Sequence, residues 1–165
     1  MKKVLALATL AAVSLLAACN QSSPADDHGS IKESTSMNYA EASRIVVENF
    51  EHIWPDPVQV DTTMVNRGNG CRTNPETLKS EGPPWTPLYE KTVTNPSPEF
   101  VERALAQLDS MTTRGFTLTP NPIPGDDPVN RVYHDGRGFS VAAHRDDYPV
   151  GVQFTMTSSS PCVDD

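Results

Sequence analysis

Basic residues are scarce in this sequence. It has 13 lysines and arginines against 21 aspartates and glutamates over 165 residues, which gives a formal net charge of −8 at pH 7. A protein that binds nucleic acid or an anionic lipid surface through its own side chains normally carries the opposite charge. The composition therefore argues against nucleic acid as a partner. It leaves attraction to cationic partners open, although solubility is the simpler explanation of the acidity.

Catalytic and cofactor motifs are missing as well. The sequence contains no G-x-S-x-G, no H-E-x-x-H, no phosphate-binding glycine loop and no EF-hand spacing. The acidic pairs Asp126-Asp127 and Asp146-Asp147 would hold calcium only if their loops converged, and aspartate is common in turns for a different reason. We therefore expect neither a cofactor nor a metal, and an enzyme is the less favoured interpretation.

Long apolar runs are limited to the first part of the chain. Residues 4–18, "VLALATLAAVSLLAA", follow Lys2 and Lys3 and are too short for a typical transmembrane helix of about 20 residues. A short basic region before an apolar core is the plan of a secretory signal peptide. We expect residues 1–18 to be removed, which leaves 11 basic and 21 acidic side chains and a formal net charge of −10.

The sequence Leu16-Ala17-Ala18-Cys19 at the end of this run resembles a bacterial lipobox. The resemblance implies cleavage before Cys19 and a thioether-linked diacylglycerol on its sulfur. Two acyl chains anchor a protein stably, whereas one binds a membrane only reversibly. The sequence thus predicts a protein on the extracytoplasmic face of the cell membrane, held there through the lipid on Cys19. The alternative is an ordinary secretory signal with a chance cysteine.

Cysteine is rare, with three residues in the chain. If Cys19 is lipidated, Cys71 and Cys162 remain, and an even pair in an exported protein indicates a disulfide bond. A catalytic thiol or a metal pair is less favoured, because neither cysteine belongs to a C-x-x-C motif or has a histidine close by in the sequence.

Large apolar side chains are nearly missing from the segment after the predicted anchor. Residues 20–38 are polar and cannot bury enough surface to offset the entropic cost of ordering. We interpret residues 19–38 as the lipidated cysteine followed by a flexible tether, with a mean reach of about 25 Å. Residues 39–165 are then expected to form a single domain.

Two amphipathic helices are predicted in that domain. Residues 38–54 repeat apolar side chains at i, i+3 and i+4, and Asn38 is placed to cap the first turn. Residues 97–115 show the same spacing, with Ser97 as the N-terminal cap and Gly115 just after the end of the helix.

Strands are predicted where apolar and polar side chains alternate. These segments are 57–66, 85–94, 116–120, 130–134, 139–145 and 150–157. Residues 72–84 show no clear pattern, and Phe116 and Leu118 are expected to point inward. One sheet face should be apolar and the other polar. The expected fold is α+β, with two amphipathic helices packed on one face of an antiparallel sheet of about five to six strands.

Three aromatic residues, Trp54, Trp85 and Tyr148, lie next to or near prolines and are candidates for contact with a partner. A shared aromatic patch on the surface is one interpretation of this placement. Half-buried positions at the edge of the core are the commoner alternative for such residues.

Two histidines, His134 and His144, fall on the strands of one predicted hairpin and are candidates for cross-strand neighbours. Together with Asp135, Asp146 or Asp147 they would be suited to acid–base chemistry or to metal binding. The alternative is a polar, solvated sheet face beside a turn.

Several features in chain order resemble small actinobacterial lipoproteins of the LppA-like type. They are the lipobox, an early helix followed by "WPDP", one mid-chain cysteine, "RGFTLTP" at 114–120 and a final strand running into "SPC" at 160–162. The resemblance covers most of residues 39–163 and implies lipidation and the fold. Proteins of this type are largely without assigned activity, and the segment 120–128 is longer than their pattern implies.

Three functions are compatible with these features. The first is a binding or adaptor module of the cell envelope, which predicts a hydrophobic groove or a specific envelope partner. The second is an immunity or exclusion lipoprotein, whose acidic charge would suit a basic target. The third is an envelope hydrolase, which requires His134 and His144 to point into one pocket. We favour the first.

Overall fold

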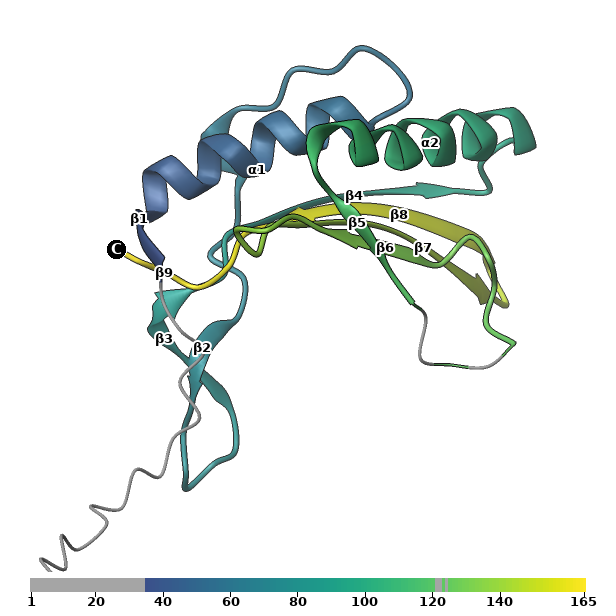
Figure 1. Ribbon diagram of the computed structural model, residues 1–165. Coiled ribbons are helices and arrows are strands. Elements are labelled where there is room, and N and C mark those ends of the chain that lie inside the picture. The colour runs from purple at the N-terminus through teal and green to yellow at the C-terminus, as the bar shows by residue number, and fades with distance from the viewer. Residues whose placement is uncertain (1–34, 121–122, 124) are drawn as a thin grey trace, which may run out of the picture.

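The computed structural model describes residues 35–120, 123 and 125–165, and it arranges them as helices over a sheet with a second, smaller sheet beside it (Figure 1). In chain order the elements are β1 (Thr35–Asn38), α1 (Tyr39–Ile53), the 3₁₀ turn η1 (Thr62–Met64), β2 (Gly70–Thr73), β3 (Ser80–Trp85), β4 (Leu88–Thr94), α2 (Pro98–Ser110), the 3₁₀ turn η2 (Met111–Arg114), β5 (Thr117–Thr119), β6 (Arg131–His134), β7 (Ser140–Tyr148), β8 (Gly151–Ser159) and β9 (Val163–Asp164). The predicted α+β class is confirmed.

The larger sheet has five antiparallel strands in the order β4-β8-β7-β6-β5. Both helices lie on the same face of this sheet, as Figure 1 shows. The strands β6, β7 and β8 form the meander that the alternation in residues 130–157 predicts. The sequence therefore indicates a sheet of about this size and the helix layer that covers it.

The core lies between the helices and this sheet. Phe50 of α1 and Leu108 of α2 have no exposed surface, and neither do Phe154 and Met156 of β8. Complete burial of each such side chain stabilises the fold by roughly 1.5–3 kcal/mol relative to leaving it in water. These residues occupy the apolar positions of the predicted periodicities, so the pattern and the packing agree.

The helix ends are also where the sequence predicts them. The Asn38 side chain accepts a hydrogen bond from the backbone N–H of Glu41 at 2.9 Å, and the Ser97 hydroxyl accepts one from Phe100 at 3.2 Å. Gly115 follows the second helical segment with φ of 87°, a left-handed conformation that glycine adopts without a steric penalty.

The face of the large sheet that points away from the helices is polar. Its side chains include Thr92, Thr94, Thr117, Thr119, Ser140, Thr155, Thr157 and Ser159. Neighbouring hydroxyls bond to each other across the strands, at 2.8 Å between Thr92 and Thr155 and at 2.6 Å between Ser140 and Ser159. The predicted division into an apolar and a polar face is confirmed.

The smaller sheet, with strand order β1-β9-β3-β2, is not predicted by the sequence. Residues 35–38, assigned above to the tether, form β1 and pair in parallel with β9. The hairpin of β2 and β3 extends away from the helices (Figure 1). At its base a Cβ on Gly70 would lie 1.9 Å from the carbonyl carbon of Glu81, so only glycine permits this approach.

The prediction of a strand over residues 57–66 is wrong. The Asp61 carboxylate accepts hydrogen bonds from the backbone N–H and the hydroxyl of Thr63, both at 2.8 Å, and this local bonding starts the 3₁₀ turn η1. Met64 is 57% exposed, so the alternating side chains do not share a buried face. Only Asn66 joins the sheet, through an isolated bridge to Leu88.

Phe116 and Leu118, which are predicted to point inward, both lie on the helix side of the sheet, but only Phe116 is buried. Phe116 is 4% exposed, whereas Leu118 is 48% exposed. Leu118 pairs with Tyr133 and so lies on the helix side of the sheet. Because β5 is the edge strand of the sheet, the helices cover little of the Leu118 side chain.

Candidate functional site

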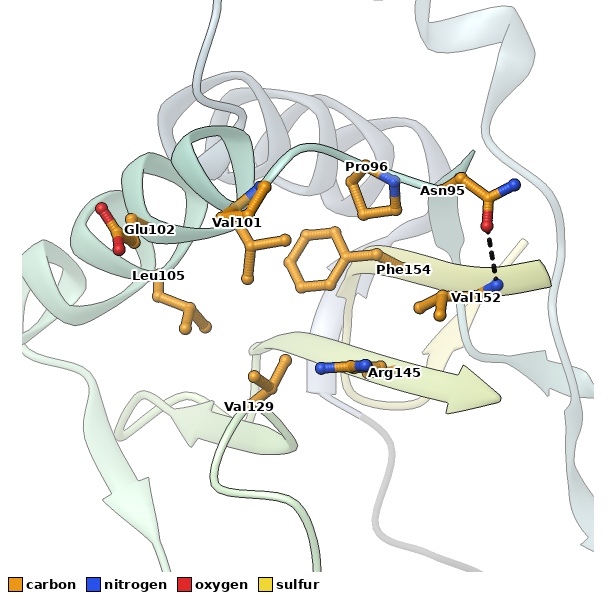
Figure 2. A pocket seen from close by; sticks show the side chains of 10 residues that line it. Asn95, Pro96, Val101, Glu102, Leu105, Val129, Arg145, Val152 and Phe154 are labelled. Atoms are coloured by element: carbon orange, nitrogen blue, oxygen red, sulfur yellow. Dashed lines mark hydrogen bonds between the residues drawn. The ribbon is translucent and has the colours of Figure 1, made fainter. Parts of the chain in front are cut away.

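An open cleft of about 490 Å³ lies between α2 and the neighbouring ends of β7 and β8 (Figure 2). Its lining residues come from the β4–α2 connection, α2, the segment before β6, and the two strands. They are Asn95, Pro96, Pro98, Val101, Glu102, Leu105, Val129, Arg145, Val152 and Phe154. Volumes of this order are typical of sites for small molecules.

The sequence between β4 and α2 determines where the cleft opens. Asn95 follows the last residue of β4, and its backbone N–H donates to the carbonyl of Val152 at 2.7 Å. Its side-chain oxygen accepts from the backbone N–H of Val152 at 2.9 Å. Asn95 thus fixes the chain to β8. The helix α2 begins a few residues later, with Ser97 as its cap and Pro98 as its first residue. The first turns of α2 therefore lie directly beside the N-terminal end of β8.

The walls of the cleft are apolar. Val101 and Leu105 project from α2, Val129 comes from the segment before β6, and Phe154 forms the floor. Phe154 is fully buried and makes a T-shaped contact with Phe100, with ring centroids 6.2 Å apart. Burial of an apolar group here contributes about 25 cal/mol of binding free energy for each Å² removed from water. The cleft therefore favours apolar ligands.

Polar groups are few in this cleft, and the basic one is Arg145. It pairs with Phe154 across β7 and β8, and so lies on the helix side of the sheet. Its backbone N–H donates to the side-chain oxygen of Asn130 at 2.8 Å. Figure 2 shows the side chain extending beneath Phe154 toward Val129, whereas the Glu102 carboxylate points away from Phe154. Arg145 is therefore the one cation among the lining residues, and it lies beside largely apolar walls.

A second hollow, of about 530 Å³, lies beside the β2–β3 hairpin. Its walls include Cys71, Arg72, Thr73 and Thr86 together with Ser159. The lining is more polar and consists largely of backbone and small side chains. It therefore presents more polar surface to a ligand than the cleft beside α2 does.

The disulfide predicted between Cys71 and Cys162 is present. The two Cα atoms are 6.0 Å apart, and the residues are 91 positions apart in the sequence. Cys71 belongs to β2, and Cys162 follows β8 immediately before β9. The bond therefore ties the smaller sheet to the end of the larger one.

The three candidate contact aromatics lie on different elements. Trp54 is 7% exposed at the end of α1, stacks on Phe50 and carries the Lys91 ammonium over its ring, so it offers a partner almost no surface. Trp85 lies in β3 beneath the Arg67 guanidinium. Tyr148, at the end of β7, is 48% exposed.

The two candidate histidines are not brought together. His134 pairs with Ser140 across β6 and β7, whereas His144 lies four ladder positions further along β7 and pairs with Thr155 on β8. At about 3.3 Å per residue, this separates them by roughly 13 Å. His134 Nδ1 bonds to the hydroxyl of Thr119 at 2.7 Å, and His144 Nε2 bonds to Asp146 at 3.0 Å. The geometry gives no shared pocket for hydrolysis.

A polar cluster near the end of α2 joins the helix to the sheet. The Asp109 carboxylate accepts two hydrogen bonds from Arg131 Nη1, at 2.9 and 3.0 Å, and another from the phenol of Tyr133. Burial and then the hydrogen bond to Asp109 raise the pKa of Tyr133 above its ordinary value. The fold therefore favours the neutral phenol.

The raised pKa of Tyr133 predicts a loss of stability in alkali. The stabilisation is complete below the unfolded pKa of about 10 and declines as the pH rises from there through the folded value. We expect the urea unfolding free energy to fall as the pH rises above about 10, and to fall less in Tyr133→Phe. Tyr148→Phe, at an exposed tyrosine, is the control and should follow the wild type. Parallel pH profiles for Tyr133→Phe and the wild type would contradict this assignment.

The described part of the chain shows neither a metal-binding cluster nor a membrane-spanning helix. There, no group of three or more histidine, cysteine, aspartate or glutamate side chains is placed to hold a metal ion. Nor does residue range 35–120, 123 and 125–165 contain a helix long and apolar enough to cross a membrane. Cys19 lies outside the described residues, so its lipidation stays a prediction.

The cleft itself is the feature that sequence reasoning missed. Its residues belong to five segments, and each segment has a simpler explanation as a helix face, a strand face or a turn. The one available signal is the sequence Asn95-Pro96-Ser97-Pro98, which starts a helix within a few residues of the end of a strand. Comparison with models of known families, with curated proteins and with solved structures found no match, so the geometry of the cleft carries the functional argument.

Proposed function

We propose that the chain is a lipoprotein of the cell envelope whose domain binds a ligand in the cleft beside α2. In this proposal a diacylglycerol on Cys19 holds the protein on the extracytoplasmic face of the cell membrane. The observation that carries the binding function is the apolar lining of the cleft, with Val101, Leu105 and Phe154 around one open volume of about 490 Å³. A hydrophobic groove is what a binding module requires.

The disulfide supports the compartment. Disulfides persist in exported proteins and are rare where cytosolic thiols keep cysteines reduced. Cys71 and Cys162 are bonded, and the bond links β2 of the smaller sheet to the segment between β8 and β9. An oxidising location outside the cytoplasm agrees with the predicted signal peptide at residues 1–18 and with a lipid on Cys19.

A small ligand fits the cleft better than a large protein partner does. The apolar surface is concave and is bounded by α2 on one side and by β7 and β8 on the other (Figure 2). Protein interfaces of standard size bury about 800 Å² on each partner, which needs a broader surface than this cleft. The immunity or exclusion alternative, supported by the acidic charge, requires a basic protein target instead.

Ligand recovery from native membranes tests this function. We expect one class of apolar small molecule to be released in near-equal molar amount when the purified wild-type protein is denatured and its contents are analysed by mass spectrometry. Leu105→Gln places an amide in the cleft wall and should lose most of this molecule. Leu78→Gln is the matched control, because Leu78 is 79% exposed in the β2–β3 hairpin.

Crosslinking in the same membranes separates the alternatives. Recovery of one basic protein in near-equal amount, with no small molecule from either variant, would overturn the cleft proposal and favour the immunity or exclusion function. Equal recovery of the small molecule from Leu105→Gln and Leu78→Gln would also contradict the cleft as the site. Melting temperatures of both variants show whether the fold is retained.

A further inference from the structure

We infer that the cleft binds a single-chain amphiphile with an anionic headgroup, whose apolar chain lies along α2 and whose headgroup meets Arg145. This inference rests on the proposed function, since it names the ligand class of the same cleft. It depends on three features of the described residues: a continuous apolar wall, one basic side chain at its edge, and weak existing partners for that side chain.

The arrangement of polar groups favours a ligand with one polar end. Among the lining residues, polar side chains are limited to Asn95, Glu102 and Arg145. The Asn95 oxygen already accepts a hydrogen bond from Val152, and Glu102 points away from the floor of the cleft (Figure 2). A ligand with polar groups along its whole length would leave most of them without partners, which is costly. A chain with a single headgroup leaves none.

Arg145 is suited to an anionic headgroup because its present ion pairs are long. Its Nη2 lies 3.5 Å from the Asp147 carboxylate, and its Nη1 lies 3.8 Å from that of Asp127. A guanidinium has five N–H donors and binds carboxylate or phosphate oxygens in pairs at shorter distances than these. The Arg145 side chain is 40% exposed at the cleft, so a headgroup can reach it from solvent.

The carboxylates of Asp127 and Asp147 compete with a ligand anion for the Arg145 guanidinium. A substitution of one of them makes this competition measurable. Asp127 is held in place, because its Oδ1 accepts the backbone N–H of Val129 at 2.9 Å. The Asp147 carboxylate is 74% exposed and can turn into solvent. Removing the Asp147 charge should therefore strengthen anion binding, whereas a site for a cation would be weakened by the same change.

Calorimetric titration of the chain from residue 19 onward tests the ligand class. The chain carries Cys19→Ala, so that no attached acyl group competes, and it contains all the described residues. The probes are octanoate, decanoate and dodecanoate below their micelle concentrations, with decyltrimethylammonium and decyl maltoside as cationic and neutral comparisons. Each added methylene should raise the affinity about fourfold, because each contributes about 0.8 kcal/mol on burial. Decanoate should bind at least about tenfold more tightly than decyltrimethylammonium.

Variants of the charged residues separate the headgroup contact from the apolar cleft. Arg145→Gln should weaken decanoate about tenfold and leave decyl maltoside unchanged, since only the charged hydrogen bonds are lost. Asp147→Asn should strengthen decanoate about two- to threefold at low salt. The control Arg72→Gln removes a guanidinium from β2, outside the cleft, and should change neither affinity.

The outcomes distinguish this inference from the function on which it rests. Equal affinity for the three headgroups, or no effect of Arg145→Gln, would overturn the anionic headgroup while Leu105→Gln still weakened every probe. An affinity that does not depend on chain length would overturn the amphiphile. If a different class of molecule is recovered from native membranes with the wild type alone, the proposed function holds and the inference fails.

Discussion

The double variant Cys71→Ser with Cys162→Ser should lose about 4 kcal/mol of unfolding free energy. The two cysteines are 91 positions apart, and closing a loop of this size restricts the unfolded chain strongly. The bond also links β2 to the residue before β9, on the other side of β3 in the smaller sheet. Stability losses of this size are a large fraction of the total for a domain of ordinary stability.

Urea unfolding of the oxidised wild type, the reduced wild type and the double variant measures this effect. The reduced wild type should match the double variant, because both lack the covalent bond. The urea midpoint should fall. The signal of the folded state should change little, because α1, α2 and the five-stranded sheet stay folded before the transition. A difference below about 1 kcal/mol would show that the denatured state is not restricted as the loop length requires.

The variant Cys19→Ala should lose all incorporation of labelled fatty acid in a host that processes lipoproteins. The thioether forms on the Cys19 sulfur, and alanine has no group that accepts the lipid. Two acyl chains account for stable anchoring, so this change removes the whole anchor rather than weakening it. The double variant of Cys71 and Cys162 is the matched control and should keep its label.

Labelling is the appropriate readout, because an uncleaved signal peptide would by itself hold the variant at the membrane. Acyl label retained by Cys19→Ala would mean that the lipid is elsewhere. No label in the wild type would mean that residues 1–18 are an ordinary secretory signal. Either result would remove the anchor from the proposed function and would leave the cleft beside α2 to be tested separately.

The sequence predicts the elements whose signals are local. The helix α1 is defined by its apolar spacing and by Asn38, which caps it as expected. The strands β7 and β8 alternate clearly and are adjacent in the chain, so their pairing follows from a short connection. For these elements, the local preference and the tertiary packing require the same structure, and each prediction is confirmed.

The smaller sheet and the cleft depend on contacts between distant segments. The strand β1 pairs with β9 more than a hundred positions later, and neither strand has a hydrophobic alternation of its own. At residues 57–66 the alternation is present but the Asp61 side chain forms a turn instead. The cleft forms because α2 and β8 are fixed side by side at Asn95. The hydrophobic periodicity of the sequence does not indicate that contact.

Native mass spectrometry of the protein from its own membranes tests the central claim most directly. The protein should have the mass of residues 19–165 with a diacylglycerol on Cys19, together with a non-covalently bound amphiphile that Leu105→Gln lacks. A mature chain without an acyl group would contradict the anchor. A wild type that carries no bound molecule, or the same bound molecule in Leu105→Gln, would contradict the cleft as a binding site.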